Sequence, residues 1–184
     1  MQLLDTEVAG VHVVTNEPAA DERGLFARTF SRADFARWGL ETDVEECSTS
    51  FNERALTLRG MHHQVGDAAE AKLVRCTRGR VFDVAVDLRP DSPTYLKWAG
   101  VELSADDRRA LYVPKGCAHG FLTLEDASEV YYQISAPYRR DAGAGIRWDD
   151  PAIGVHWTHT PRVISARDAS YPLVLDSAAS DPPG

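Results

Sequence analysis

Short stretches in which apolar and polar residues alternate run through most of the chain. This two-residue period is typical of β-strands with one buried face. Residues 80–88 show it best, because every second residue from Phe82 is apolar and Asp83 and Asp87 occupy the other face. Further strands are expected at residues 8–14, 24–30, 58–64, 72–76, 97–103, 110–113, 120–124 and 129–135. Turns containing Gly or Pro separate many of them.

One stretch has a convincing helical pattern. Ser31 can cap the start of a helix, Phe35 and Trp38 then share one face, and Gly39 can end it. Many short strands, little helix and no regular alternation of strands with helices predict an all-β fold. We expect an antiparallel jelly roll with few short helices.

Composition indicates the class of protein. The chain has 184 residues, of which 43% are hydrophobic, and this suffices for one domain with a buried core, expected at residues 1–176. Residues 177–184 are small, polar and rich in proline, and are expected to fray. A net charge of −8 argues against a nucleic-acid surface. Arg23, Arg59 and Arg75 stand singly in mixed segments, which suits the binding of a small anion.

The sequence also predicts a location. No apolar run approaches the length of a membrane span, and the first residues lack the basic and apolar regions of a signal peptide. Cys47, Cys76 and Cys117 are odd in number and widely spaced. We therefore expect reduced thiols in a cytoplasmic protein that contacts no membrane.

Two adjacent histidines stand in the strand expected at residues 58–64. Successive side chains of a strand point to opposite faces, so only one of His62 and His63 can face a cavity. An isolated buried histidine is more often a core residue than a catalyst. However, Arg59, Lys72 and His119 lie in segments that a jelly roll can bring around the same mouth, and this favours a catalytic His62. We expect His63 on the opposite face, packed or partly exposed.

Residues 113–121 contain the pattern P-x-G-x-x-H, which recurs in cupin-type jelly rolls. Pro114 and Gly116 set a turn, and His119 then enters the mouth of the barrel. Many cupins bind a metal through two histidines two residues apart, a carboxylate and a later histidine. Here the first two histidines are adjacent and Lys72 would add a competing cation, so we expect no metal.

Other polar residues allow two interpretations. One of Tyr131 and Tyr132 must face the interior, where a tyrosine can serve as a general acid, although a lone tyrosine is more often a core residue. Tyr138 can stack on an aromatic base or cover the edge of the core. Surface or turn positions are expected for a further group of charged residues: Asp83, Asp87, Asp149, Asp150, Arg139 and Arg140.

Taken in order, these motifs resemble the dTDP-4-dehydrorhamnose 3,5-epimerase family. Any one segment is a weak indication, but the ordered set covers nearly the whole chain. The similar segments are residues 21–26 (DERGLF), 57–62 (TLRGMH), 71–75 (AKLVR), 81–89 (VFDVAVDLR), 92–94 (SPT), 113–121 (VPKGCAHGF), 129–132 (EVYY), 145–151 (GIRWDDP) and 165–168 (SARD).

The resemblance implies a cupin-like homodimer with an exchanged N-terminal strand, which acts on a nucleotide-linked 4-keto-6-deoxyhexose without a metal or organic cofactor. The 4-ketone acidifies the hydrogens at C3 and C5. His62 is then the expected base, Asp168 its orienting carboxylate, and Tyr132 the acid on the opposite face. Lys72 is expected to stabilise the enolate oxygen.

The same resemblance implies a set of substrate-binding residues. Arg23 and Arg59 are expected to hold the pyrophosphate, and His119 to contact the substrate. Phe26 and Tyr138 are expected to line the nucleotide or sugar pocket.

The chain departs from the family at several positions, most of which serve nucleotide recognition or lie near it. Arg28 and Gly143 stand where glutamate is usual, Glu46 and Ser48 where glutamine and asparagine are usual, and His63 where an aromatic residue is common. The chemistry is therefore better supported than the nucleotide. Three alternatives stay open: a mono-epimerase at C3 or C5 on a differently linked 4-ketosugar, a non-catalytic sugar-nucleotide-binding cupin, and a metal-dependent cupin oxygenase or isomerase.

Overall fold

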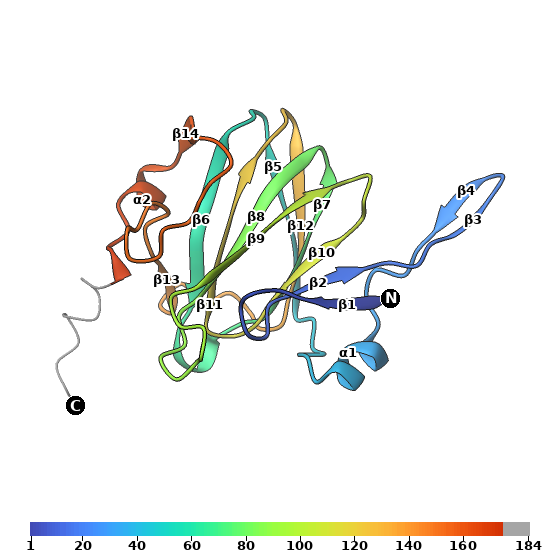
Figure 1. Cartoon of the computed structure of the whole chain (residues 1–184), viewed down its shortest axis with the longest axis horizontal. Helices are drawn as coiled ribbons and strands as arrows, with labels where there is room; N and C mark the ends of the chain where they lie inside the picture. Colours follow the sequence, from blue (N-terminus) through green and yellow to red (C-terminus); the bar gives the residue numbers. More distant parts are fainter. Residues whose placement is uncertain (175–184) are drawn as a thin grey trace.

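The structure is a computed structural model that describes residues 1–174. These residues form a sandwich of two mainly antiparallel sheets (Figure 1). In spatial order, the first sheet contains β1 (Gln2–Asp5), β2 (His12–Thr15), β10 (Ala110–Val113), β7 (Lys72–Arg78), β12 (Ser128–Ile134) and β5 (Glu46–Asn52). The second contains β13 (Gly143–Gly145), β6 (Thr57–Gln64), β11 (Cys117–Thr123), β8 (Arg80–Asp87) and β9 (Trp98–Ser104), with β14 (Val163–Ile164) parallel to β6.

The prediction of an all-β fold with few short helices is confirmed. The described residues contain the α-helices α1 (Arg32–Trp38) and α2 (Ala166–Ala169) and the 3-10 turn η1 (Gly66–Ala68). No helix in residues 1–174 has the length and apolar content needed to cross a membrane. The tail predicted at residues 177–184 lies outside the described part of the chain.

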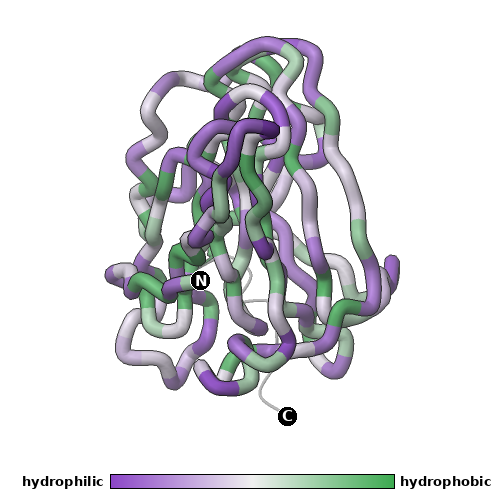
Figure 2. Tube along the Cα trace, turned by 90° about the vertical axis from the view of Figure 1, so that its right-hand side faces the viewer, coloured by the Kyte–Doolittle hydropathy of each residue, from purple (hydrophilic) through white to green (hydrophobic). Residues whose placement is uncertain are grey.

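The space between the sheets is filled by apolar side chains from both of them. Val74 and Val130 of the first sheet pack with Ala85 and Phe121 of the second, and all four are almost completely buried. Figure 2 shows hydrophobic stretches along the strands, whereas many of the connecting turns are hydrophilic.

Helix α1 follows its sequence signals closely. Ser31 Oγ accepts a hydrogen bond from the backbone N–H of Asp34, and Gly39 ends the helix in the left-handed region with φ 72°. Phe35 is buried against the outer face of the first sheet. The predicted helix is therefore confirmed at both ends.

Before α1 the chain forms a hairpin instead of the longer strand expected at residues 24–30. Strands β3 (Ala19–Asp21) and β4 (Gly24–Phe26) pair only with each other and project away from the sandwich (Figure 1). Phe26 at the end of β4 is 76% exposed. The hairpin thus presents an apolar side chain that no residue of its own sandwich covers.

Gly79, between the end of β7 at Arg78 and the start of β8 at Arg80, carries the chain from one sheet to the other. Strand β7 belongs to the first sheet and β8 to the second, so these neighbours in sequence do not pair. Gly79 has φ 72°, and a Cβ at this position would lie 2.5 Å from Ser128 Oγ. Glycine is required because both the backbone conformation and the space exclude a side chain.

Strand β8 is buried on both faces, which its alternating sequence does not reveal. Val84 and Val86 on the outer face pack in one apolar cluster with Ile153 and Val174, which come from the C-terminal part of the chain. The other face of β8 looks into the sandwich. A segment that follows much later in the sequence therefore buries the side that would otherwise meet solvent.

This double burial corrects one prediction. Asp83 and Asp87 are fully buried in β8, so their assignment to turns or the surface is wrong. Asp150 does lie in a turn, where its carbonyl accepts from the N–H of Ile153, but it is only 2% exposed. Only Asp149 of the four is exposed. A buried carboxylate needs partners, and each of the three has them.

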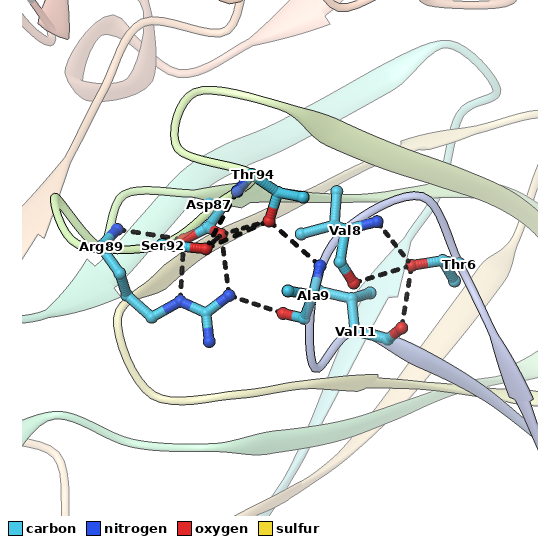
Figure 3. A network of polar contacts seen from close by, with 8 residues as sticks. All are labelled: Thr6, Val8, Ala9, Val11, Asp87, Arg89, Ser92 and Thr94. Carbon is cyan, nitrogen blue, oxygen red and sulfur yellow. Dashed lines mark hydrogen bonds and ion pairs between the residues drawn. The ribbon is translucent and has the colours of Figure 1, made fainter.

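The partners of Asp87 illustrate how the acid is accommodated (Figure 3). Arg89 donates to both carboxylate oxygens, with 2.8 Å contacts from Nε and Nη2, and the hydroxyls of Ser92 and Thr94 donate to Oδ2. Burial opposes ionisation of Asp87, but these hydrogen bonds outweigh it and hold its pKa far below the usual range. Ala9 joins the network through its carbonyl to Arg89 and its N–H to Thr94, which ties the β1–β2 connection to the end of β8.

Candidate active site

Strands β6 and β11 place two histidines opposite each other. His62 on β6 and His119 on β11 are direct register partners, and Arg59 is the partner of Phe121. The register shifts between these two pairs, so β6 contains one extra residue, a β-bulge. Plain alternation would send Arg59 and His62 to opposite faces. The bulge reverses this, and both side chains share the inner face with His119 and Phe121.

The bulge depends on two glycines. Gly60 has φ 144°, and a Cβ there would lie 2.6 Å from the Cα of Gly120 on the paired strand. A Cβ on Gly120 would in turn lie 2.5 Å from the sulfur of Met61. The close approach of the two backbones therefore excludes side chains at both positions.

His62 is paired with a carboxylate delivered from the C-terminal helix. Its Nε2 lies 2.8 Å from Asp168 Oδ1, and Asp168 Oδ2 accepts from the backbone N–H of Gly60 at 3.2 Å. Ser165 Oγ caps α2 by accepting from the N–H of Asp168. Burial opposes ionisation of Asp168, but the contact with His62 outweighs it and lowers the pKa of the carboxyl.

This pairing leaves His62 suited to take a proton. When Nε2–H donates to Asp168, Nδ1 carries the free lone pair, and the carboxylate stabilises the imidazolium that forms on protonation. The His62 side chain is 39% exposed, whereas that of Asp168 is 7% exposed. His62 can therefore contact a ligand while the buried Asp168 keeps the imidazole ring in a fixed orientation.

His119 forms a second pair of the same kind, deeper in the sandwich. Its Nε2 lies 2.8 Å from Asp83 Oδ1, and both side chains are buried. The ring of Tyr132, from β12 in the facing sheet, stands edge-on to His119 with the centroids 5.9 Å apart. These three residues connect the two sheets across the interior.

Tyr132 is held in its protonated form. Burial and the nearby charge of Asp83 raise the pKa of its phenol well above the usual range, and Arg59 only partly offsets them. Tyr131 points to the other face, where it hydrogen-bonds Cys47. Tyr132 can therefore keep its proton until an adjacent strong base needs it.

A cavity of about 180 Å³ opens beside His62. Its wall includes Lys72, whose Nζ donates to the His62 carbonyl at 3.2 Å and contacts Glu70 Oε1 at 3.0 Å. His119 and Tyr132 do not line it. A larger hollow of about 730 Å³ is lined by residues of β2 and β9 and by none of the predicted site residues. The smaller cavity is the candidate site because it joins the dyad to the lysine. Its full lining is Glu46, His62, His63, Gln64, Glu70, Lys72, Ile134, Ala136, Tyr138, Gly143, Ala144 and Arg167.

Comparison with known proteins assigns the chain to a family of enzymes. The sequence pattern of the family described as dTDP-4-dehydrorhamnose 3,5-epimerase matches residues 5–176. The enzyme of that name from Sinorhizobium fredii is 39% identical over 181 residues, which cover 98% of this chain and 93% of the relative. The chain belongs to the dTDP-4-dehydrorhamnose 3,5-epimerase family.

Two solved structures extend the comparison. An epimerase from Legionella pneumophila in complex with dTDP-4-keto-L-rhamnose is 30% identical with a TM-score of 0.89, over 96% of this chain and 95% of that one. A 3'-monoepimerase from Streptomyces bikiniensis in complex with dTDP-quinovose is 26% identical with a TM-score of 0.87, over 96% and 89%. The predicted cupin-like jelly roll and the predicted isomerase class are confirmed, and a nucleotide sugar is the class of ligand these relatives bind.

Some residues predicted to bind the substrate of this epimerase do not line the cavity beside His62 in the same chain. Arg59 is exposed at a second opening of about 400 Å³, where its Nε donates to Asn52 Oδ1 at 2.7 Å. Tyr138 stands at the rim of the cavity beside His62 and is 59% exposed. Arg23 and Phe26 lie on the β3–β4 hairpin, away from the cavity of their own chain (Figure 1).

Several residues at the site were missed by sequence reasoning. Arg167 lines the cavity, and its guanidinium carbon lies 5.6 Å from the centroid of the Tyr171 ring. Tyr171 stands edge-on to His62 with the ring centroids 5.8 Å apart. Arg167 could have been found from its place next to Asp168. Asp83 could have been found only by anticipating that both faces of β8 are buried.

The metal-dependent alternative has no candidate ligand set in residues 1–174. No three side chains of His, Cys, Asp or Glu gather there as a metal site requires. Nε2 of His62 and of His119 each already contacts a carboxylate.

Proposed function

We propose that this epimerase inverts C3, C5 or both in a dTDP-4-keto-6-deoxyhexose, by proton transfer through an enolate in deoxysugar biosynthesis. The observation that carries the proposal is the half-exposed His62 bound to buried Asp168 beside a cavity that also contains Lys72. The ligand in the Legionella relative supports the substrate class.

The proposed reaction begins with His62. Its Nδ1 takes the proton from the carbon next to the ketone, and the electron pair of the broken C–H bond moves into the carbonyl to form an enolate. Asp168 stabilises the imidazolium that results. Lys72 stabilises the negative oxygen at C4, which exists only once the C–H bond breaks, so its effect falls on the rate rather than on binding.

Inversion requires a proton from the other face of the ring. We assign this step to the partly buried Tyr132, whose raised pKa keeps the phenol protonated at neutral pH. The phenol O–H breaks as the new C–H bond forms, the carbonyl is restored, and the phenolate regains a proton as His62 releases one. The net reaction consumes no proton and needs no oxidant.

Substrate binding is proposed to use residues from two subunits. Arg59, His119 and Tyr138 come from the chain that holds the base. Arg23 and Phe26 are exposed on a hairpin that projects from the sandwich, and a second copy in a homodimer provides a site for them to reach. Arginine suits the pyrophosphate because its guanidinium donates in pairs.

A mono-epimerase is the second candidate, because the Streptomyces bikiniensis relative is a 3'-monoepimerase of the same fold. The departures at Arg28, Glu46, Ser48 and Gly143 also allow a different nucleotide. A non-catalytic sugar-nucleotide-binding protein is a further alternative, although binding alone does not require a base, an acid and an orienting carboxylate.

Incubation in deuterated water with dTDP-, CDP-, UDP- and GDP-linked 4-keto-6-deoxyglucose tests these proposals. We expect deuterium at C3, C5 or both with the dTDP substrate, and none with His62→Asn. Label at a single carbon identifies a mono-epimerase. No label at either carbon with any of the four substrates would overturn the catalytic proposal.

A further inference from the structure

Lys72 is held by two contacts that its own strand does not provide. Its Nζ lies 3.0 Å from Glu70 Oε1 and donates to the carbonyl of His62 at 3.2 Å. An ammonium has three N–H donors, so two are used within the described chain and one is left for the cavity that Lys72 lines. Glu70 and the backbone of the proposed base together fix where this third donor points.

Glu70 is itself rigidly placed. The next residue, Ala71, donates its N–H to Ser135 Oγ at 2.8 Å and accepts from the Ser135 N–H at 3.0 Å. Before it, the turn η1 is held by Gln64, whose side chain donates to the Ala68 carbonyl. The ion pair with Lys72 therefore does not require two loose side chains to be ordered, unlike an exposed pair.

The pair is also poorly arranged for stability alone. The side chains of Lys72 and Glu70 are only 11% and 5% exposed. Glu70 Oε2 is buried and has no hydrogen-bond partner in the described part of the chain, and neither has His63 Nδ1 in the same cavity wall. Burying two charges and leaving one carboxylate oxygen unpaired costs free energy that the ion pair repays poorly. Such an arrangement beside a catalytic dyad is better explained by function.

His63, in the same cavity wall, adds no charge next to the Lys72–Glu70 pair. Burial, followed by the charge of Lys72, lowers the pKa of His63, so its ring is neutral at pH 7. Of the two glutamates in the cavity wall, Glu46 and Glu70, Glu70 is the one whose carboxylate contacts Lys72.

We propose that Glu70 is a positioning residue that holds the Lys72 ammonium against the oxygen at C4 of the substrate. The inference rests on the proposed function, in which Lys72 stabilises the enolate. Without the carboxylate, Lys72 keeps only the His62 carbonyl, and its ammonium can rotate away from the oxygen. Since a misplacement of about 1 Å can cost on the order of 100-fold in rate, Glu70→Ala is expected to lower kcat by roughly 10- to 100-fold.

A double-mutant cycle tests this role with the full-length protein and dTDP-4-keto-6-deoxyglucose. The variants are Glu70→Ala, Glu70→Gln, Lys72→Met and the combinations of each Glu70 change with Lys72→Met. We expect Glu70→Ala to lower kcat for exchange while KM and the dissociation constant for dTDP change less than about twofold. Glu70→Gln, which keeps an acceptor oxygen, should recover part of the rate. In the Lys72→Met background neither change should lower the rate further.

Asp67→Asn is the matched control, because Asp67 is an exposed acid in the preceding turn that pairs with Arg139. It should leave kcat and KM unchanged. An equal loss from Glu70→Ala with and without Lys72, an effect on KM alone, or a rate like that of the unchanged enzyme would overturn the inference. If Glu70→Ala does not fold, as judged by its thermal transition, the same cycle with Glu70→Gln decides. Failure of the proposed function is distinguishable, because then the unchanged enzyme itself shows no exchange.

Discussion

His62 and His119 lie directly opposite each other on paired strands, and the Nε2 atom of each ring is 2.8 Å from a buried carboxylate. The two pairs differ in exposure: the side chain of His62 is half-exposed and that of His119 is buried. Only His62 is therefore placed to exchange protons with a ligand and with solvent. His119 is placed to fix Tyr132 and the edge of the site.

The dyad predicts a large effect of Asp168. Asp168→Asn can offer its amide N–H to Nε2 and so favours the tautomer in which Nδ1 carries the proton and cannot act as the base. We expect exchange to fall by about 10³-fold or more, as for other histidine–carboxylate pairs. The rate of deuterium incorporation, followed by NMR, measures this. Asp149→Asn is the control, because Asp149 is exposed and pairs with Arg147. Near-normal exchange in the Asp168→Asn enzyme would contradict the role of Asp168 in orienting His62.

Tyr132→Phe should separate the two halves of the reaction. The variant keeps the base, so His62 still removes the substrate hydrogen, but the opposite face has no acid. We expect inversion, particularly at C5, to fall more than the wash-out of label from the substrate. Tyr131→Phe, which changes the outer face of the same strand, should affect neither. Equal losses of wash-out and inversion in Tyr132→Phe would not support a separate acid.

The bulge in β6 predicts an unusual sensitivity at Gly60. Gly60→Ala would combine a positive φ with a 2.6 Å clash against Gly120, and we expect a loss of about 2–5 kcal/mol in the free energy of unfolding. Gly24→Ala separates the two causes, because Gly24 has φ 127° but no atom within 4 Å of the added Cβ. It should cost about 1 kcal/mol. Urea unfolding of both variants gives the comparison, and equal losses would show that the clash contributes nothing.

Asp87 predicts a pH dependence of stability. Its folded-state pKa is depressed, so its contribution is present above the unfolded-state value of about 3.9 and is lost as the pH falls below it. Asp87→Asn should therefore destabilise the protein at pH 7 and flatten the decline in stability below about pH 4. Asp91→Asn, an exposed acid of the same connection, should change the free energy of unfolding by less than about 0.5 kcal/mol. Parallel declines for the Asp87→Asn variant and the unchanged protein would exclude Asp87 as the source.

The proposed sharing of a site between the subunits of a homodimer predicts complementation. In a dimer of Arg23→Ala with His62→Asn, one site has both the base and the partner's arginine, and the other has neither. After unfolding and refolding an equal mixture, half the dimers are mixed, so about a quarter of the normal activity should return. Activity no higher than the mean of the two separate variants would show that Arg23 serves its own chain.

Local patterns predicted much of the fold. The limits of α1 follow from Ser31 and Gly39, and strand β10 spans the expected residues. These elements are determined by neighbours in sequence, so a pattern of a few residues suffices. The edge strand β5 was missed, since its polar residues show no apolar face.

Contacts between distant segments were harder to predict. C-terminal residues cover the face of β8 that carries Val84 and Val86, so the opposite face, with Asp83, looks into the sandwich. No property of β8 itself indicates this arrangement. Likewise, alternation alone would separate Arg59 from His62, and only the pairing of β6 with β11 reveals the bulge that unites them. Arg59, His62 and Lys72 were singled out by strand alternation and by their place in segments expected around one mouth, whereas Asp168 was found only by resemblance to a family.

The carboxylate partner of His62 is separated from it by 106 positions and comes from α2, the last helix in the described chain. Every strand of the sandwich except the short β13 and β14 ends at or before Ile134. During translation the ribosome therefore produces a nearly complete sandwich before it adds Asp168. A nascent or prematurely terminated polypeptide can contain the proposed base His62, the proposed acid Tyr132 and Lys72. It gains the carboxylate that orients His62 only when synthesis is almost finished.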